Sequence, residues 1–279
     1  MSKADIVGGL TLVTGGTGKT GRRVADRLRA MNRPVRIGSR SAEPSFDWDD
    51  RSTWGPALQG VQSVYVTFQP DLAVPRALAI VRAFFAEAVG RGVKKLLLLS
   101  GRGEIEAEHA EQALQQLDVD WTILRASWFA QNFSENYFLD SILAGEVALP
   151  MGEVPEPFVD VDDIAEIAVA ALTEAGHSRQ LYELTGPRAL TFAEAVGEIA
   201  SATGRTIRCV DVPHAAYRAT LEQAQLPAET IDLVLYLFTT VLDGRNTPIA
   251  DGVQRALGRA PRDFSDYVRR TAATGVWNR

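Results

Sequence analysis

A glycine-rich turn near the amino terminus holds the residues whose spacing most clearly suits chemistry. Residues 14–21 read Thr-Gly-Gly-Thr-Gly-Lys-Thr-Gly and follow the apolar run of residues 10–13. A strand that feeds such a turn and opens a helix is where the diphosphate of a dinucleotide binds. Gly15 permits the tight turn, Gly18 lets the backbone approach the phosphates, and Gly21 lets the helix pack closely, while the free N–H groups of its first turn attract an anion. The sequence therefore predicts a nucleotide site with contacts from Gly15, Thr17, Gly18, Lys19, Thr20 and Gly21.

One stretch inside this turn resembles a different phosphate site. Gly18, Lys19 and Thr20 match the end of the phosphate-binding loop of ATPases. That loop also needs a glycine five positions before Gly18, and this chain has Val13 there, inside the predicted strand. The ATPase interpretation is therefore rejected.

The end of the second predicted strand bears on which dinucleotide binds. An acidic residue there would accept hydrogen bonds from a ribose 2′-hydroxyl and repel a 2′-phosphate, but the segment reads Gly-Ser-Arg-Ser. Arg40 can form charge-assisted bonds to a phosphate, and Ser39 and Ser41 can add hydroxyl donors. This favours NADP over NAD, with a solvated arginine in an arginine-rich chain as the alternative. Asp47 and Trp48 would then flank the adenine, although packing is an equal alternative for Trp48.

The usual proton donor of short-chain dehydrogenases, a tyrosine with a lysine four residues later, is missing. None of the six tyrosines has lysine at that offset: Tyr65, Tyr137, Tyr182, Tyr217, Tyr236 and Tyr267. Hydride delivery to a ketone creates an alkoxide that needs an adjacent acid. An iminium ion instead gives a neutral amine, and a quinone gives a phenolate-like anion whose conjugate acid has a pKa of only about 10. If the chain is a reductase, such activated acceptors are its expected substrates, and catalysis comes mainly from holding them against the nicotinamide.

Two residues remain as candidate catalytic groups. Ser100 follows the leucine-rich strand expected at residues 96–99, and His109 lies on the next predicted helix, near where the tyrosine would stand. Histidine is the side chain best suited to proton transfer near neutral pH; the alternative is a surface histidine on a glutamate-rich helix. Three aspartates farther along are expected to cap a helix rather than act on substrate: Asp160, Asp162 and Asp163.

Composition limits the classes of partner. The chain has 279 residues, 46% of them hydrophobic, with a net charge of −6 and a sequence pI of about 5.2. An acidic chain without a helix-turn-helix or other reader motif is not expected to bind nucleic acid. Its apolar runs fall short of the about 18 residues of a membrane span, so no membrane association is expected.

The sparse cysteine and histidine content favours a protein without disulfides or metal. Cys209 is the only cysteine, which excludes an internal disulfide, and residues 1–9 lack the basic segment and apolar core of a signal peptide. Both observations favour a reducing cytoplasm, where Cys209 is expected to be a small buried residue rather than a reactive thiol. The histidines are scattered, so no metal site is expected: His109, His177 and His214.

Strand-like runs alternate with helical patterns up to about residue 125. Apolar strands separated by helices predict an α/β fold with a parallel sheet covered on both faces. Strands are expected at residues 35–38, 45–47, 63–68, 96–99 and 121–124, and helices at 73–91 and 104–117. Ligands bind beyond the carboxyl ends of such strands. That rule marks residues 15–21, 38–40, 47–48, 68–70, 100–101 and 126–132 as candidate site loops.

The alternation weakens after about residue 145. A strand near residues 181–186 is expected to return to the same sheet, and Thr191 with Glu194 has the spacing of a capping box. A Pro/Gly loop is expected at residues 152–157, a helix at 163–174, and mostly helices over 205–279. The sequence thus predicts a dinucleotide-binding domain over 1–150 and a smaller, mostly helical substrate lobe over 151–279, interleaved with the sheet. An apolar helical face over residues 230–242 favours core packing over lining a substrate pocket.

Several motifs together resemble a known family. They are Val-Thr-Gly-Gly-Thr-Gly-Lys-Thr-Gly at residues 13–21, Ser-Arg-Ser at 39–41, Phe-Asp-Trp at 46–48, Ser-Thr-Trp at 52–54, Leu-Arg-Ala-Ser-Trp-Phe at 124–129, Gln-Asn-Phe at 131–133, Phe-Val-Asp-Val-Asp-Asp-Ile-Ala at 158–165 and Leu-Thr-Gly-Pro at 184–187. Across nearly its whole length the chain resembles the NmrA-like branch of the atypical short-chain dehydrogenases. The resemblance is strongest to the festuclavine and agroclavine dehydrogenases of ergot alkaloid biosynthesis, which reduce an iminium with NADPH. The motifs that carry it are Gly-Lys-Thr at residues 18–20, Asp-Trp at 47–48 and Ser-Thr-Trp at 52–54.

The resemblance implies a Rossmann-type doubly wound sheet that binds NADP(H). It implies cofactor contacts from the glycine turn, Arg40, Asp47, Trp48, Phe68 and Ser100, and places Ala126, Ser127, Trp128 and Phe129 near the nicotinamide. Contacts are also expected from the neighbouring Ser39, Ser41, Thr67 and Gln69. Relatives are expected to have Arg-Pro where this chain has Arg125-Ala126, a departure that bears on nicotinamide placement.

The family holds more than one functional class. The favoured expectation is a reductase acting on a small hydrophobic or cationic substrate, because the apolar helical lid suits a small-molecule pocket. The alternative is an NAD(P)-sensing regulator that binds a partner protein and needs no catalytic residues, and a redox-neutral lyase or isomerase is a third. The motifs leave homodimer formation, the acceptor and the stereochemistry open.

Overall fold

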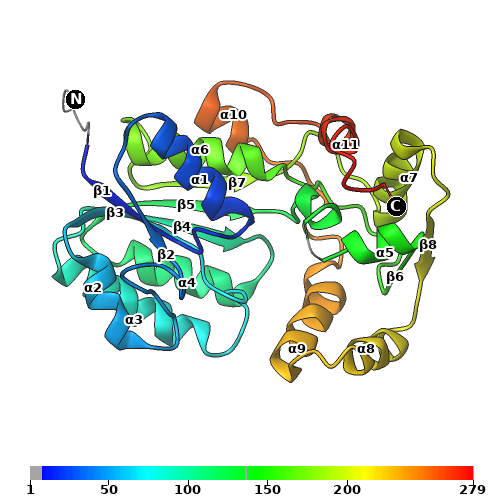
Figure 1. The fold of residues 1–279 in the computed structure, drawn as a ribbon, viewed down its shortest axis with the longest axis horizontal. Helices are drawn as coiled ribbons and strands as arrows, with labels where there is room; N and C mark the ends of the chain where they lie inside the picture. Colours follow the sequence, from blue (N-terminus) through cyan, green and yellow to red (C-terminus); the bar gives the residue numbers. More distant parts are fainter. Residues whose placement is uncertain (1–7, 136, 279) are drawn as a thin grey trace. The chain divides into compact units, whose positions relative to one another are not determined.

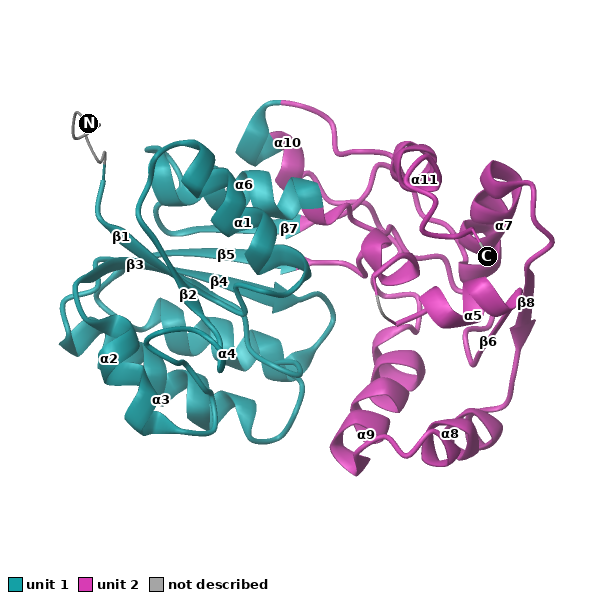
Figure 2. Ribbon diagram, viewed as in Figure 1, with its two compact units in different colours: residues 1–125, 162–183, 255–258 teal, residues 126–161, 184–254, 259–279 magenta. Residues whose placement is uncertain are grey.

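The structure is a computed structural model that describes residues 8–135 and 137–278. The chain divides into two compact units, which Figure 2 colours separately. Unit 1 comprises residues 1–125, 162–183 and 255–258, and unit 2 comprises residues 126–161, 184–254 and 259–279. The sequence prediction divides the chain at residue 150, with a return to the sheet near residues 181–186. The compact units divide it at residue 125, and the chain returns to unit 1 at residues 162–183 and 255–258.

Unit 1 is built on a six-stranded sheet in the order β2-β1-β3-β4-β5-β7. The β1–β2, β1–β3 and β3–β4 pairs are parallel. Leu12, Val64 and Leu97 have no exposed surface, as expected for strands with helices on both faces. The direction of strand succession changes between β1 and β3, so a ligand crevice is expected beyond their carboxyl ends. The strands are β1 Leu10–Thr14, β2 Val35–Gly38, β3 Val61–Val66, β4 Lys95–Gly101, β5 Asp120–Ala126 and β7 Gln180–Leu184.

Helices cover the two faces of this sheet in the doubly wound arrangement of a Rossmann-type fold. In Figure 1, α1 (Lys19–Ala30) and α6 (Val161–Thr173) lie on one face, and α2 (Trp54–Leu58), α3 (Ala77–Gly90) and α4 (Ile105–Gln115) lie on the other. A short 3-10 helix, Arg51–Thr53, leads into α2. The predicted fold class is confirmed.

Unit 2 packs helices and a two-stranded parallel sheet around an aromatic core. Four phenylalanine rings contact one another at its centre, and the centroids of the contacting rings are 5.1–6.1 Å apart: Phe133, Phe158, Phe192 and Phe264. Its elements are a 3-10 helix Ala130–Phe133, α5 Leu139–Ala144, β6 Glu146–Leu149, α7 Phe192–Thr203, β8 Arg208–Asp211, α8 His214–Gln223, α9 Ala228–Tyr236, a π-helical turn Leu237–Val241 and α11 Phe264–Ala272. Helix α10, Gly252–Leu257, begins in unit 2 and ends in unit 1.

Several predicted elements are confirmed. Strand β7 joins the main sheet. The hydroxyl of Thr191 accepts the N–H of Glu194, whose carboxylate accepts the N–H of Thr191, so the capping box forms. The apolar face over residues 230–242 is buried in the unit 2 core, which confirms packing for Ile231, Leu235, Phe238 and Leu242.

Other predicted elements were wrong. Residues 45–47 form no strand, and Asp47 makes only an isolated bridge with Asp50. Helix α3 begins at Ala77 rather than residue 73, because the ring of Pro75 disfavours a helical conformation at the residue before it. Strands β6 and β8 were not predicted; each spans four residues, and they pair across about 60 positions of sequence.

A charged cluster in unit 2 makes stability depend on pH. Arg188 donates to both carboxylate oxygens of Asp263, each at 2.8 Å, and Asp263 also accepts the N–H of Ser265 at the start of α11. These bonds, the Arg188 guanidinium first, hold the pKa of Asp263 well below its usual value of 3.8. Because the folded pKa is depressed, the stabilisation is present above the unfolded pKa and is lost as pH falls below about 4.

Asp263→Asn is therefore expected to lower the free energy of unfolding by about 1–2 kcal/mol at pH 7, within the range for charged hydrogen bonds at a partly exposed site. The difference from the wild type should shrink as pH falls below about 4, measured by urea unfolding. Asp266→Asn, on the exposed face of the same helix, is the control and should cost no more than about 0.5 kcal/mol. A pH-independent difference would contradict the prediction.

Candidate functional site

The glycine turn after β1 forms a cradle of backbone groups. Gly15 has φ +58°, in the left-handed region, and its carbonyl accepts the N–H of Gly18 at 2.8 Å. Helix α1 then begins at Lys19, and no side chain caps its first turn. A methyl group added at Gly21 would lie 2.2 Å from the carbonyl oxygen of Gly15, so the helix touches the turn closely. The uncapped N–H groups and the close backbone approach suit a diphosphate.

The end of β3 is fixed beside this turn. Thr14 Oγ1 donates to the carbonyls of Tyr65 and Thr67 and accepts the N–H of Thr67 at 2.9 Å. A methyl group added at Gly15 would lie 2.3 Å from Thr67 Oγ1 and 4.0 Å from Gln69 Nε2. The structure thus brings Thr67 and Gln69 to the glycine turn. Thr14, which clasps the two strands, was not singled out from sequence, because its role depends on the β1–β3 pairing.

The loop after β2 presents an exposed cation. Arg40 is exposed and makes no hydrogen bond or ion pair with any of residues 8–135 and 137–278. Ser39 Oγ and Ser41 Oγ lie 3.3 Å apart, and the carbonyl of Ser39 accepts the N–H of Phe46 at 2.9 Å. The loop therefore has a fixed backbone while the guanidinium stays available to an anion.

Trp48 belongs to a buried aromatic cluster under this loop. It is 8% exposed, its indole N–H donates to the carbonyl of Thr67 at 3.1 Å, and its ring contacts Phe46, Trp54, Phe68 and Phe84. Phe68 is 6% exposed. Trp48 therefore packs among aromatic rings, and its contact with adenine stays a prediction.

Asp47 organises its own turn. Its carboxylate accepts the N–H of Asp49 at 3.0 Å, and its carbonyl accepts the indole N–H of Trp54 at 2.8 Å. Arg51 stacks over the Trp54 ring. Contact of Asp47 with adenine stays a prediction.

Ser100 lies in a buried charge network at the carboxyl ends of β4, β5 and β7. Its hydroxyl donates to Glu111 at 2.6 Å, and Glu111 also accepts Arg125 Nε at 2.9 Å. Arg125 reaches Glu183 at 3.0 Å, and Arg102 pairs with the same carboxylate at 3.5 Å. Hydrogen bonding to Glu111 raises the pKa of Arg125 further above its usual value. The hydroxyl proton of Ser100 is therefore committed to Glu111.

The two predicted catalytic residues are in different surroundings. His109 lies on the exposed side of α4, whereas Ser100 is 4% exposed. A surface histidine was the alternative stated for His109, and its catalytic role stays a prediction. Glu111 was not predicted as a site residue, because nothing local in the sequence shows that β5 brings Arg125 to it.

In unit 2, residues 126–129 are held by backbone bonds. Ser127 N–H donates to the carbonyl of Leu184 at 3.0 Å, and the carbonyl of Trp128 accepts the N–H of Val159 at 2.9 Å. The Trp128 ring packs on Phe192 and Phe238. The Trp128 ring is therefore held in place by aromatic packing within this unit. Its contact with a nicotinamide stays a prediction.

The aspartates near the start of α6 make specific contacts. Asp160 accepts Gln131 Nε2 at 2.7 Å and the guanidinium of Arg270, and Gln131 Oε1 accepts the N–H of Val161, the first residue of α6. Asp162 pairs in unit 1 with Arg27 of α1 at 2.8 Å. Asp160 and Asp162 therefore make structural contacts, and Asp162 links α6 to α1. Capping of α6 by the three aspartates stays a prediction.

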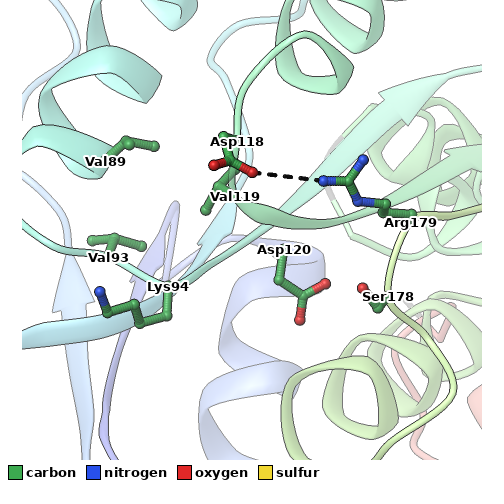
Figure 3. A pocket seen from close by; sticks show the side chains of 8 residues that line it. All are labelled: Val89, Val93, Lys94, Asp118, Val119, Asp120, Ser178 and Arg179. Atoms are coloured by element: carbon green, nitrogen blue, oxygen red, sulfur yellow. Dashed lines mark ion pairs between the residues drawn. The ribbon is translucent and has the colours of Figure 1, made fainter.

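A shallow pocket of about 390 Å³ lies at the opposite edge of the unit 1 sheet, at the amino ends of β4, β5 and β7. Figure 3 shows Asp118 paired with Arg179 across it at 3.8 Å. The pocket contains none of the predicted site residues; its lining is Val89, Val93, Lys94, Asp118, Val119, Asp120, Ser178 and Arg179.

In the part of the chain formed by residues 8–135 and 137–278, no group of three His, Cys, Asp or Glu side chains is arranged to hold a metal ion. Nor does that part contain a helix long and apolar enough to cross a membrane.

The thiol of Cys209 is protonated at neutral pH, because burial raises its pKa to about 11.

Comparisons with known proteins give close and distant relatives. No family model matches the chain. An uncharacterized oxidoreductase, YesF, of Bacillus subtilis (strain 168) is 33% identical, over 95% of this chain and 97% of its own. Agroclavine dehydrogenase of Claviceps fusiformis is 30% identical, over 92% and 95%. The structure of an NADPH-dependent quinone oxidoreductase, QOR2, from Escherichia coli, complexed with NADPH, has a TM-score of 0.74 at 20% identity, covering 93% of this chain and 99% of that one.

Proposed function

The chain belongs to the NmrA-like family of atypical short-chain dehydrogenases/reductases, and on that premise we propose that it is an NADPH-dependent reductase. Its acceptor is an activated small molecule such as a quinone or an iminium ion. The observation that carries the proposal is the uncapped start of α1 behind Gly15, with an exposed Arg40 at the end of the neighbouring strand. Related proteins of full length are named as oxidoreductases and dehydrogenases, which supports the reductase over a regulator.

NADPH would be held by three sets of residues. The N–H groups at the start of α1 would bind the diphosphate, because they have no intrahelical acceptors. Arg40, with Ser39 and Ser41, would bind the 2′-phosphate. Thr67 and Gln69, which the structure brings beside the turn, would line the crevice between β1 and β3. When bound, the cofactor supplies a hydride.

The acceptor class follows from the proton balance. The chain has no tyrosine with a lysine four residues later. A simple ketone, whose reduction gives a strongly basic alkoxide, is therefore disfavoured, whereas acceptors that give a neutral amine or a stabilised anion are favoured. QOR2, a solved structure with the same fold, is named as a quinone oxidoreductase, and a quinone is one of the acceptors proposed for this chain.

Turnover tests the proposal. Purified protein with NADPH and a panel of quinones, iminium ions, enones and simple ketones should show loss of NADPH absorbance with the first two classes and little with the ketones. Tight NADPH binding with no turnover of any acceptor would contradict the reductase and favour a cofactor-sensing regulator.

Arg40→Ala is expected to weaken NADPH binding by about 1.5–3 kcal/mol, the range for a charged hydrogen bond, or about 10- to 150-fold. NADH binding should be unchanged, because it has no 2′-phosphate. Calorimetric titration of both cofactors measures this. Arg29→Ala, which removes an exposed arginine paired with Asp26 on α1, is the matched control. Equal losses for both cofactors would contradict the role of Arg40.

A further inference from the structure

Two carboxyl groups meet at the ligand-binding edge of the unit 1 sheet. Asp71 lies in the loop after β3, and Glu104 immediately precedes α4. The Glu104 side chain folds back over the end of β4, so that a methyl group added at Gly101 would lie 2.1–2.3 Å from its three carboxyl atoms. Glu104 is only 7% exposed.

One oxygen of this pair has no donor from the protein. Asp71 Oδ1 accepts the N–H of Ala73 at 2.9 Å. Glu104 Oε2 is buried, and no donor among the described residues reaches it. The Asp71 carboxyl is within hydrogen-bonding reach of Glu104. Two carboxylates can bond to each other only through a proton, so a proton shared by the pair would give the Glu104 carboxyl a partner.

The surrounding charges favour retention of that proton. Burial raises the pKa of Glu104 well above its usual value, and the negative charges of Asp71, Glu106 and Glu111 raise it further. Asp71 is half-buried, and its partial loss of hydration likewise raises its pKa. The arginines of the two loops are ion-paired with other carboxylates, Arg76 with Asp49 and Arg102 with Glu183.

The pair lies next to residues already placed at the proposed cofactor site. Asp71 is two residues beyond Gln69, whose amide lies at the glycine turn. Gly101, over which Glu104 folds, directly follows Ser100. Both loops leave the carboxyl ends of adjacent strands, the edge where ligands of such sheets bind.

We propose that Asp71 and Glu104 hold one proton between them at neutral pH and deliver it to the reduced acceptor, so that the substrate is a quinone or conjugated ketone rather than an iminium ion. This rests on the proposed reductase function. The acceptor gains a hydride with its electron pair from NADPH, which is oxidised to NADP⁺, and becomes an oxyanion. The pair's O–H bond then breaks as an O–H bond forms on the product, and water returns a proton to the pair.

Isosteric variants test the transfer. Glu104→Gln and Asp71→Asn keep the side-chain shape but leave no shared proton, and each should lower kcat for quinone reduction by about 100-fold, the lower range for general acid catalysis. The dissociation constant for NADPH should be unchanged. In the wild type, kcat should fall as pH rises and the pair loses its proton, and in Glu104→Gln this limb should be absent.

Two further variants separate chemistry from structure. Gly101→Ala should also lower kcat, because its methyl group displaces the Glu104 carboxyl, the movable end of a side chain, without a clash against backbone. Glu106→Gln removes a neighbouring negative charge but leaves the pair intact, so its kcat should match the wild type at low pH while the fall in kcat moves to lower pH. Any iminium turnover should be equal in all five proteins, because that reaction needs no proton.

A readout independent of turnover is the infrared carbonyl band of a protonated carboxyl group, expected at pH 7 in the wild type and lost in Glu104→Gln. Absence of the band in the wild type would overturn the shared proton, whatever the activity. Equal quinone kcat in wild type and variants, or equal losses for both acceptor classes, would overturn proton delivery while leaving the reductase proposal standing. A wild type that reduces no acceptor, with the band present, would instead overturn the reductase and delivery with it.

Discussion

Replacing Gly21 with alanine is expected to weaken NADPH binding by at least about 100-fold, or about 2.7 kcal/mol. The added methyl group would lie 2.2 Å from the carbonyl oxygen and 2.8 Å from the carbonyl carbon of Gly15. Both are backbone atoms, so no side-chain rotation relieves the contact. Helix α1 must move off the turn, and the N–H groups at its start then no longer converge on the diphosphate. Calorimetric titration with NADPH measures the loss.

A matched glycine serves as control for this variant. Gly197 lies inside α7 on the exposed surface, and a methyl group there meets no atom within 4 Å. Gly197→Ala should leave NADPH binding unchanged and raise the free energy of unfolding by about 0.4–1 kcal/mol. Gly21→Ala should also lose stability, by about 1–3 kcal/mol, through overpacking. Wild-type affinity in a folded Gly21→Ala protein would contradict diphosphate binding at the turn.

Arg125→Met is expected to lower the free energy of unfolding by about 3–5 kcal/mol, the cost of breaking a buried ion pair. Its partner Glu111 has a side chain only 3% exposed and would lose two hydrogen bonds from the guanidinium. The hydroxyl of Ser100 would remain as a donor to that carboxylate, but a neutral donor does not balance a buried charge. Urea unfolding at pH 7 measures the loss.

The double variant Glu111→Leu/Arg125→Met isolates the cause. Removing both charges should recover most of the stability, because the penalty comes from leaving one charge buried alone. Arg179→Met, at the opposite edge of the sheet and paired with Asp118 at 3.8 Å, should cost under about 1 kcal/mol because both side chains are exposed. A double variant no more stable than Arg125→Met would contradict this account.

Local signals explain what could be predicted from the sequence. The glycine turn, the apolar strands and the Thr191–Glu194 capping box each depend on residues within a few positions of one another, and the structure has all three. The return of the chain to the sheet at β7 was also predicted, because residues 182–185 have a strand-like composition and follow a predicted helix.

Features that depend on distant residues were not predicted. The partners in the β6–β8 pair lie about 60 positions apart, and β4, α4 and β5 must all be placed before Ser100, Glu111 and Arg125 can meet. The Asp71–Glu104 pair has no spacing signal at all. The hydrogen bond from the Trp48 indole to Thr67 was not predicted either, because it requires the end of β3 to lie beside the loop after β2.

The repeated passage of the chain between its two units restricts how it can be recombined. A cut at residue 150 would deprive the main sheet of its β7 edge strand and of α6, which Arg27 and Asp162 tie to α1. Grafting the second unit from a relative would instead require coordinated splices near residues 125, 161, 183, 254 and 258. Unit 2 is thus expected to diverge by single amino-acid substitutions, because no one continuous segment of the chain could be exchanged to replace it.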